Sequence, residues 1–274
     1  MEKRPVAYQL YSAREEAEKN LASVLETLKK QGYEGVEFAG FYGHSAAQIR
    51  KMLETYGLKA VSSHVPLQKI EEDMFGTIAY HQEIGCPYIA VPYLEEEKRP
   101  GMQEFAHVLQ VIHRFAALAK AGGIQVLYHN HDFEFVKLSG MYGLDFLYEA
   151  IPSDLLKTEL DVCWVKYAGE EPAAYIRKYA GRCPIIHLKD YVGQKEEGLT
   201  PYALIGLEEK EKKEAPAFEF RPVGYGCQDV KSILEAGIES EAEWFVVEQD
   251  QSVGRPPLEA AGMSIGTLKQ LGLV

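Results

Sequence analysis

Histidines and carboxylates, the side chains that most often bind transition metals, recur in short polar segments of this sequence. Each segment follows a run of β-branched or aromatic residues, as expected at the end of a strand. A mixed set of imidazoles and carboxylates suits Mn²⁺, Zn²⁺, Co²⁺ or Fe²⁺ better than an all-oxygen Ca²⁺ site. The main segments are SSH at 62–64, HNHDFEF at 129–135, ELD at 159–161, HLKD at 187–190 and EQD at 248–250.

Within these segments the reactive residues stand two positions apart. Side chains at i and i+2 of a strand point to the same face, so both members of such a pair can face one site. For any single residue, a satisfied polar side chain at a strand end is a commoner role than metal ligation. The repetition over several strands favours a divalent metal site. The pairs are His129 and His131, Glu159 and Asp161, His187 and Lys189, and Glu248 and Asp250.

The elements that must position these residues are eight strand candidates that alternate with helical segments. Six of the seven steps between strand starts are 25–37 residues long, the length of one βα unit. The spacing predicts a (β/α)₈ TIM barrel, whose active-site residues lie at the C-terminal ends of the strands. An open doubly wound sheet is the alternative, but its nucleotide-binding version would carry a glycine-rich turn after the first strand, where this chain has YSAR. The strand candidates are 6–11, 35–40, 60–66, 88–93, 125–130, 156–162, 185–190 and 244–250, and the helix candidates are 13–31, 45–56, 102–121, 172–179 and 257–271.

The composition is that of an ordinary globular protein, and the length allows one large domain or two small ones. The predicted barrel favours a single domain over residues 1–274. Lys and Arg number 29 against 41 Asp and Glu, a net charge of −12 that argues against a nucleic-acid partner. No run of 18 apolar residues predicts a membrane span, and the N-terminus lacks the apolar segment of a secretory signal. The four cysteines form no CxxC pair, so we expect a cytoplasmic protein with reduced thiols.

The step between the last two strands is longer, at 59 residues, and predicts a loop insertion at about 191–227 on the active-site side of the barrel. Its first part, 194–213, is rich in Glu and Lys and is interpreted as a solvated loop. Its second part, 218–226, holds Phe, Arg and paired glycines, an unusual set for a solvated segment. We expect this second part to face the substrate, with Arg221 as a contact.

Four motifs follow one another in the second half of the chain: YHNHDFEF (128–135), ELDVCWV (159–165), IIHLKDY (185–191) and VVEQD (246–250). Together they resemble the sugar phosphate isomerase/epimerase family, the xylose-isomerase-like barrels, in a subgroup marked by YHNHDFEF. The resemblance implies one divalent ion (Mn, Zn, Co, Fe or Mg) with one ligand from each of the last four barrel strands. Many relatives carry Glu at the position of His129, which leaves Glu134 as the alternative ligand. The implied ligands are His129, Asp161, His187 and Glu248.

Two departures from the family's pattern bear on the reaction. The ketose 3-epimerases carry a His three residues after the strand-six Asp, where this chain has Trp164. They also move a proton between two metal-bound Glu residues, and His129 takes the place of one of them. Inosose dehydratases and related keto-sugar lyases share a His-x-His pair on strand five, which would set His131 beside the metal as an acid or base.

The resemblance implies an isomerase or epimerase that acts on a sugar or keto-sugar through a metal-stabilised enediolate. His131 and Glu248 are the candidates for proton transfer, because a base near the substrate must take the proton next to the ketone. Lys189 is expected to contact a substrate oxygen or the developing charge, with an ion pair to Asp161 or Glu159 as the alternative. The expected substrate contacts are Glu37, His64, Trp164 and Arg221.

Three other functions compete with this one. A keto-sugar or inosose lyase, a dehydratase of the same barrel family, would share the same intermediate. An endonuclease IV-like enzyme would need further His ligands and a DNA-binding groove, which the net charge of −12 disfavours. A non-catalytic sugar-binding protein would keep only the barrel. We expect a small sugar as the partner, non-phosphorylated because no glycine-rich phosphate site follows the last two strands. Neither nucleic acid nor membrane is an expected partner, and many relatives form homo-oligomers.

Overall fold

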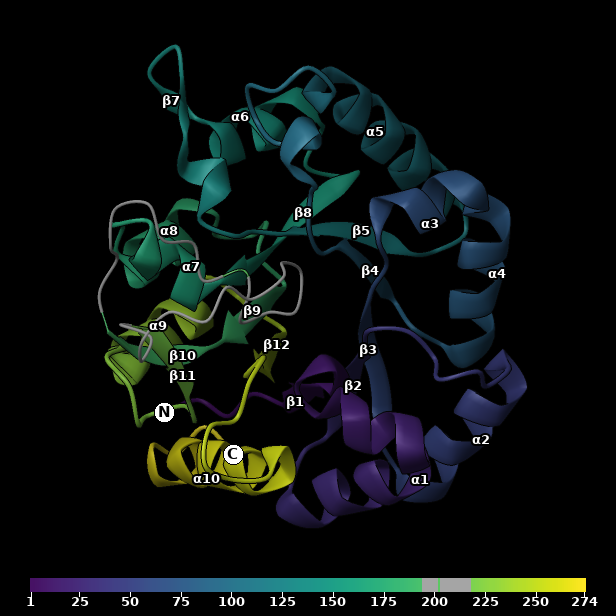
Figure 1. The fold of residues 1–274 in the computed structure, drawn as a ribbon, viewed down its shortest axis with the longest axis vertical. Coiled ribbons are helices and arrows are strands. Elements are labelled where there is room, and N and C mark those ends of the chain that lie inside the picture. Colours follow the sequence, from purple (N-terminus) through teal and green to yellow (C-terminus); the bar gives the residue numbers. More distant parts are fainter. Residues whose placement is uncertain (194–201, 203–217) are drawn as a thin grey trace.

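Eight parallel strands close into a barrel in the computed structural model, which describes residues 1–193, 202 and 218–274. Figure 1 shows the helices arranged around this barrel. The strands are short and buried on both faces, as parallel barrel strands are. This architecture confirms the predicted TIM barrel. Around the barrel the strands follow the order β1 (Val6–Gln9), β12 (Trp244–Val247), β9 (Ile185–Leu188), β8 (Leu156–Asp161), β5 (Gln125–His129), β4 (Tyr88–Val91), β3 (Lys59–His64) and β2 (Gly35–Phe38).

The five predicted helices are all present, with ends shifted by up to three residues. They are α1 (Arg14–Gln31), α2 (Ala46–Tyr56), α5 (Phe105–Ala121), α8 (Pro172–Lys178) and α10 (Pro257–Gln270). Helix α10 packs beside α1, so the two ends of the chain meet and complete the outer ring (Figure 1). The Lys269 ammonium donates to the carbonyl of Gln31, the last residue of α1, at 2.7 Å.

Five further helices were not predicted from the sequence: α3 (Leu67–Glu72), α4 (Met74–Ile84), α6 (Gly143–Ala150), α7 (Val162–Tyr167) and α9 (Val230–Glu239). Most are short, and α4 and α9 contain glycine, which weakens an isolated helix. Helix α9 needs glycine at position 237 because a Cβ there would lie 2.6 Å from the Phe245 ring of the barrel. Tertiary contact with the barrel therefore decides a helix that local propensity disfavours.

Helix α2 begins and ends as its sequence predicts. The Ser45 hydroxyl accepts from the Gln48 N–H, and the Gln48 side chain accepts from the Ser45 N–H, which together form a capping box. The helix ends at Gly57, whose φ of 64° lies in the left-handed region that glycine adopts without strain. Local chemistry is sufficient for both boundaries of this helix.

The N-terminal half of the barrel interior is filled with apolar side chains, here called the lower layer. Six of the eight barrel strands contribute to it, so it is a packed core and not a pore. The members are Ala7, Val61, Tyr88, Ala90, Leu127, Ile185, Trp244 and Val246.

After β9 the chain forms a small antiparallel hairpin from β10 (Asp190–Gly193) and β11 (Phe218–Arg221). The Asp190 carboxylate accepts from the backbone N–H groups of Gly224, Gly226 and Gln228 and fixes the segment that follows. A Cβ on Gly226 would lie 2.2 Å from this carboxylate, which explains the glycine there. The segment interpreted as solvated, 194–213, lies outside the described residues apart from Tyr202.

The remaining elements are local. A second hairpin joins β6 (Lys137–Leu138) to β7 (Met141–Tyr142), and 3₁₀ turns are formed by η1 (Leu10–Ala13), η2 (Glu96–Lys98) and η3 (Phe133–Phe135). Among the described residues, the helices are too short or too polar to cross a membrane.

Candidate active site

A cavity of about 510 Å³ opens at the C-terminal ends of the barrel strands. Its floor is polar and includes His129, His131, Lys189, Glu248 and Asp250. Its walls come from the ends of β1 to β4 and carry apolar and aromatic residues. The wall residues include Tyr11, Ala39, Pro66, Pro92 and Tyr93. A cavity with these walls and this floor can hold a small polar molecule against convergent charged groups.

Four of the floor and near-floor residues form a first ligand group, namely His129, Asp161, His187 and Glu248. One donor atom from each lies within 4.8 Å of the others, and all four side chains are buried. His129 Nε2 stands 3.4 Å from Asp161 Oδ2 and 3.8 Å from Glu248 Oε2, and His187 Nδ1 stands 3.1 Å from Glu248 Oε2. The structure therefore brings together the four residues that the sequence proposed as metal ligands.

The donor set of this first ligand group fits a divalent cation. Ligands of one ion, bonded at about 2.0–2.2 Å, stand about 3–4 Å apart, and the three pair distances given above fall in that range. Asp161 Oδ2 and both ring nitrogens of His129 are buried and lack a hydrogen-bond partner. The other Asp161 oxygen accepts from the N–H groups of Cys163 and Trp164, which leaves Oδ2 facing His129 and the Lys189 ammonium. Burial lowers the pKa of His129 to about 4, which keeps its imidazole neutral and able to donate a lone pair.

Lys189 neutralises much of the negative charge at the floor. Its ammonium lies 2.8 Å from Glu248 and from Asp250, and 3.3 Å from Asp161. Burial alone would lower the pKa of this amine, but the three carboxylates raise it well above the usual value, so the amine stays charged. Of the two roles expected from the sequence, the ion pair is present, to Asp161 rather than Glu159.

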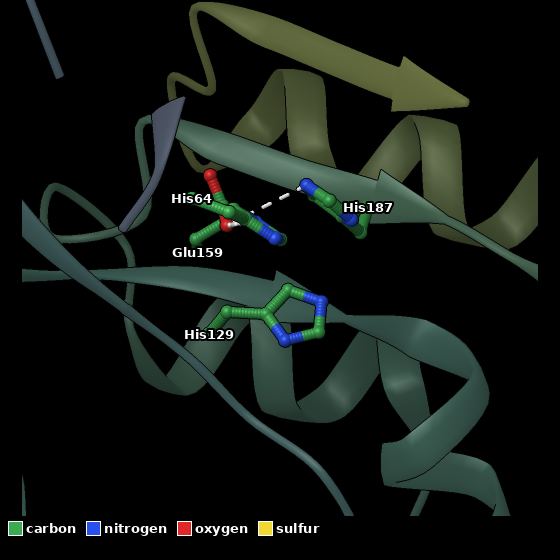
Figure 2. A group of neighbouring side chains, drawn as sticks. All are labelled: His64, His129, Glu159 and His187. Atoms are coloured by element: carbon green, nitrogen blue, oxygen red, sulfur yellow. Dashed lines mark hydrogen bonds and ion pairs between the residues drawn. The ribbon is translucent and has the colours of Figure 1, made fainter. Parts of the chain in front are cut away.

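A second ligand group, His64, His129, Glu159 and His187, shares two residues with the first (Figure 2). The His64 ring bonds to Glu159 at 2.6 Å, and Glu159 also lies 3.5 Å from His187, the contact marked by a dashed line in Figure 2. Burial is the largest influence on Glu159 and, with Glu37 beside it, raises the pKa of its carboxyl to about 7. At 2.6 Å, His64 and Glu159 lie closer together than two ligands of one ion bonded at about 2.0–2.2 Å would, so they are hydrogen-bond partners rather than a ligand pair.

His131 belongs to neither ligand group, although its ring lies next to that of His129, and it lines the cavity. Four aromatic rings surround its imidazole, namely Tyr93, Phe133, Trp164 and Tyr202. Burial moves the pKa of His131 well below its ordinary range, so the ring is neutral at physiological pH. A neutral imidazole at the cavity surface can accept a proton from a bound molecule.

Glu134, the alternative ligand, is directed away from the first ligand group. Its two oxygens accept from the Tyr128 hydroxyl at 2.7 Å and from the His131 backbone N–H at 2.8 Å. Burial raises the pKa of this carboxyl to about 8, despite these hydrogen bonds. The geometry favours His129 as the strand-five ligand, with Glu134 supporting the loop that carries His131.

Of the four residues expected to contact substrate, only His64 lines the cavity. Glu37 is fully buried beneath it and contacts His187. Trp164 is also fully buried, packed against His131 and near the Lys189 ammonium. Arg221 lies on β11, pairs with Glu219 and is not among the residues that line the cavity.

Several wall residues were not predicted as site residues, among them Tyr93 after β4, and Pro66 and Lys69 after β3. Their residue types carry no chemical signal of their own. Their position directly after a barrel strand is a signal, since loops at the C-terminal ends of the strands form the site in this fold.

The chain matches the family described as Xylose isomerase-like TIM barrel over residues 25–271, and it belongs to that family. Curated protein sequences give no match. Among solved structures it is similar to a sugar phosphate isomerase/epimerase from Parabacteroides distasonis ATCC 8503, at 22% identity and a TM-score of 0.77 over 97% of this chain and 98% of that one.

Two further similar structures have different reactions in their names. An L-ribulose 3-epimerase aligns at 15% identity and a TM-score of 0.69, over 98% of this chain and 94% of that one. The probable 3-DHS dehydratase AsbF of Bacillus anthracis aligns at 11% identity and a TM-score of 0.75, over 97% of this chain and 98% of that one. At 11–22% identity, these similarities show a shared fold and do not show a shared reaction.

Proposed function

We propose that this protein is a divalent-metal-dependent isomerase or epimerase that acts on a sugar or keto-sugar. The observation that carries the proposal is the first ligand group, His129, Asp161, His187 and Glu248, converging at the floor of a small-molecule cavity. The names of two similar structures, a sugar phosphate isomerase/epimerase and an L-ribulose 3-epimerase, support the substrate class.

A divalent cation bound by the first ligand group would supply Lewis-acid stabilisation of charge on neighbouring substrate oxygens. His131 lines the cavity next to His129 of the ligand group and is the group we assign to take the proton next to the ketone. Glu248 lines the same cavity and is the second proton-transfer group, because it faces both the ligand group and bound substrate. Lys189, a charged donor on the cavity floor, would bind a substrate oxygen.

Residues of the cavity wall and His64 would orient the substrate. Tyr11 and Tyr93 offer flat apolar faces against which the C–H face of a sugar can pack. His64 is fixed through its bond to Glu159 and reaches the cavity from β3, where it can bind a hydroxyl group. We propose a non-phosphorylated sugar as the substrate.

A lyase is the second candidate, favoured by a specific observation. His129 and His131 lie side by side, with ring centroids 5.2 Å apart, and only His131 is outside the first ligand group. An imidazole held beside the metal ligands can protonate a leaving hydroxyl as well as take a proton. The dehydratase among the similar structures is consistent with this candidate.

One experiment separates these functions. The metal-loaded protein is incubated in D₂O with ketoses and 3-keto-sugars, and the protons next to the ketone are followed by NMR. Deuterium uptake with formation of an epimer or isomer supports the leading proposal. Uptake with loss of water or of an aglycone supports the lyase. A loaded protein that binds sugars but exchanges no proton over the whole panel would contradict both and leave a sugar-binding protein.

A further inference from the structure

Glu37 is a buried carboxylate that bound substrate cannot reach. Its side chain is 0% exposed and does not line the cavity. Its Oε1 lies 2.7 Å from Nε2 of His187, although N–H and oxygen are not aligned as a hydrogen bond. The other nitrogen of the same ring, Nδ1, forms a hydrogen bond with Glu248 Oε2 at 3.1 Å, on the side of the first ligand group. His187 therefore has a carboxylate at each ring nitrogen: Glu37, which does not line the cavity, at Nε2, and Glu248, which does, at Nδ1.

The chain fixes Glu37 in place from the neighbouring strand. The side-chain amide of Gln9 on β1 donates through Nε2 to Glu37 Oε1 at 2.5 Å, and its side-chain oxygen Oε1 accepts from the Tyr11 N–H at 3.0 Å. This second bond determines which end of the amide faces Glu37. The Glu37 oxygen that contacts His187 is thus held by a side chain that is itself oriented.

Two buried carboxylates, Glu37 and Glu159, lie next to two imidazoles, those of His64 and His187, and each carboxylate is closer to a different one. Glu159 bonds to His64 at 2.6 Å and lies 3.5 Å from His187. Glu37 shows the opposite preference, at 2.7 Å from His187 and 3.2 Å from His64. The shorter contact of each carboxylate assigns Glu159 to His64 and Glu37 to His187.

An imidazole binds a cation through the nitrogen that carries no hydrogen, and a partner of the other nitrogen decides which tautomer is present. We propose that Glu37 is a positioning residue for His187: its carboxylate, 2.7 Å from Nε2, favours the hydrogen on that nitrogen, so that Nδ1, which points toward Glu248, can bind the cation. This inference rests on the proposed metal site. It replaces the expectation that Glu37 contacts substrate.

The test measures binding of Co²⁺ alone to the purified full-length protein, by titration and by the visible absorption bands of bound Co²⁺. Glu37→Gln keeps the size of the side chain and removes its charge. We expect it to weaken Co²⁺ binding about 10–100-fold, as loss of a carboxylate behind a ligating histidine does, and to shift the absorption bands. A merely structural role would leave the bands of the remaining bound Co²⁺ unchanged.

Glu159→Gln is the matched control, because it replaces the ionisable carboxyl group of an equally buried residue that is assigned to the other imidazole. We expect a much smaller loss of Co²⁺ affinity and unchanged bands. If Glu37→Gln does not fold, as judged by its melting curve, Gln9→Met keeps the carboxylate, removes its amide donor and should weaken Co²⁺ binding by a smaller factor.

The outcomes distinguish this inference from the proposed function. Wild-type affinity and an unchanged spectrum in Glu37→Gln, or in Gln9→Met if only that variant folds, overturn the inference and leave the metal site standing. A larger loss in Glu159→Gln than in Glu37→Gln also overturns it, because the ion would then belong to the second ligand group. Wild-type protein that binds no Co²⁺ overturns the proposed metal site and the inference with it.

Discussion

The lower layer and the floor of the cavity are two halves of one barrel interior, built by the same strands from opposite kinds of residues. On β9 the lower layer receives Ile185, and two residues later His187 joins the first ligand group. On β5 the same step leads from Leu127 to His129. A single strand thus changes from apolar to ionisable side chains within one repeat of its own alternation.

The difference teaches how the barrel separates stability from chemistry. Burial of the lower layer stabilises the fold by about 25 cal/mol per Å² of apolar surface. Burial of the carboxylates and histidines above it costs free energy unless they are paired or bind an ion. Lys189 provides part of that compensation through three carboxylates. Substitutions in the two halves should therefore change different measured quantities.

The largest effect is expected in the first ligand group. Asp161→Asn keeps the side-chain oxygen that accepts from Cys163 and Trp164 but removes the charge. We expect metal affinity to fall by more than about 100-fold. Loss of a residue that only supports a metal ligand costs up to about 100-fold, and loss of a ligand itself should cost more. Elemental analysis and metal titration measure it. Asp250→Asn, which removes a buried carboxylate outside the group, is the control. Equal metal content in wild type and Asp161→Asn would show that the ligand set is wrong.

The next effect separates two histidines of the floor. His131→Ala should lower turnover about 10²–10⁴-fold, the usual contribution of a general acid or base, while the protein retains its metal. His129→Ala should lower metal affinity instead, because its unpartnered nitrogens lie within the ligand group. Metal content and D₂O exchange rates are measured for both variants. Metal kept in His129→Ala but lost in Glu134→Ala would transfer the ligand role to Glu134.

A substitution in the lower layer should have the opposite profile. Leu127→Ala deletes fully buried apolar groups and should lower the free energy of unfolding by about 2–5 kcal/mol. Metal affinity should remain close to that of wild type, because Leu127 belongs to the apolar cluster and not to a ligand group. Urea denaturation and metal titration check the two halves of this expectation. If Leu127→Ala instead kept the stability of wild type and bound metal more weakly, the lower layer and the cavity floor would not have the separate roles described above.

The smallest effect, measured as a change per pH unit, concerns the pH dependence of stability at Glu134. Burial raises the pKa of its carboxyl to about 8 in the folded protein, against 4.5 ordinarily. The unfolded chain therefore loses this proton first, and wild type should lose stability as pH rises from about 5 to 8, by up to about 1.4 kcal/mol per pH unit. Glu134→Gln lacks this loss, so its stability relative to wild type should increase with pH. Denaturation at several pH values tests the trend, and parallel curves for the two proteins would contradict it.

Much of the fold and of the first ligand group could be predicted from the sequence. The regular steps between strands predicted the barrel, and the i, i+2 pairs predicted which side chains share a face. Short helices such as α3 and α7 could not be predicted, because one or two turns carry too little periodicity. Trp164 and Arg221 could not be placed either. Neither residue type indicates whether a loop buries its side chain beneath a site or directs it away.

The sequence by itself determined the strand order along the chain and the position of polar residues at strand ends, and its family resemblance named Asp161, His187 and Glu248 as candidate ligands, with His129 or Glu134 as the fourth. Only the tertiary structure decided that Glu37 of β2 contacts His187 of β9, and that Glu134 is directed toward Tyr128. The physical reason is that alternation within a strand fixes the face of each side chain. Which residues meet across the interior depends on how eight strands tilt, stagger and close.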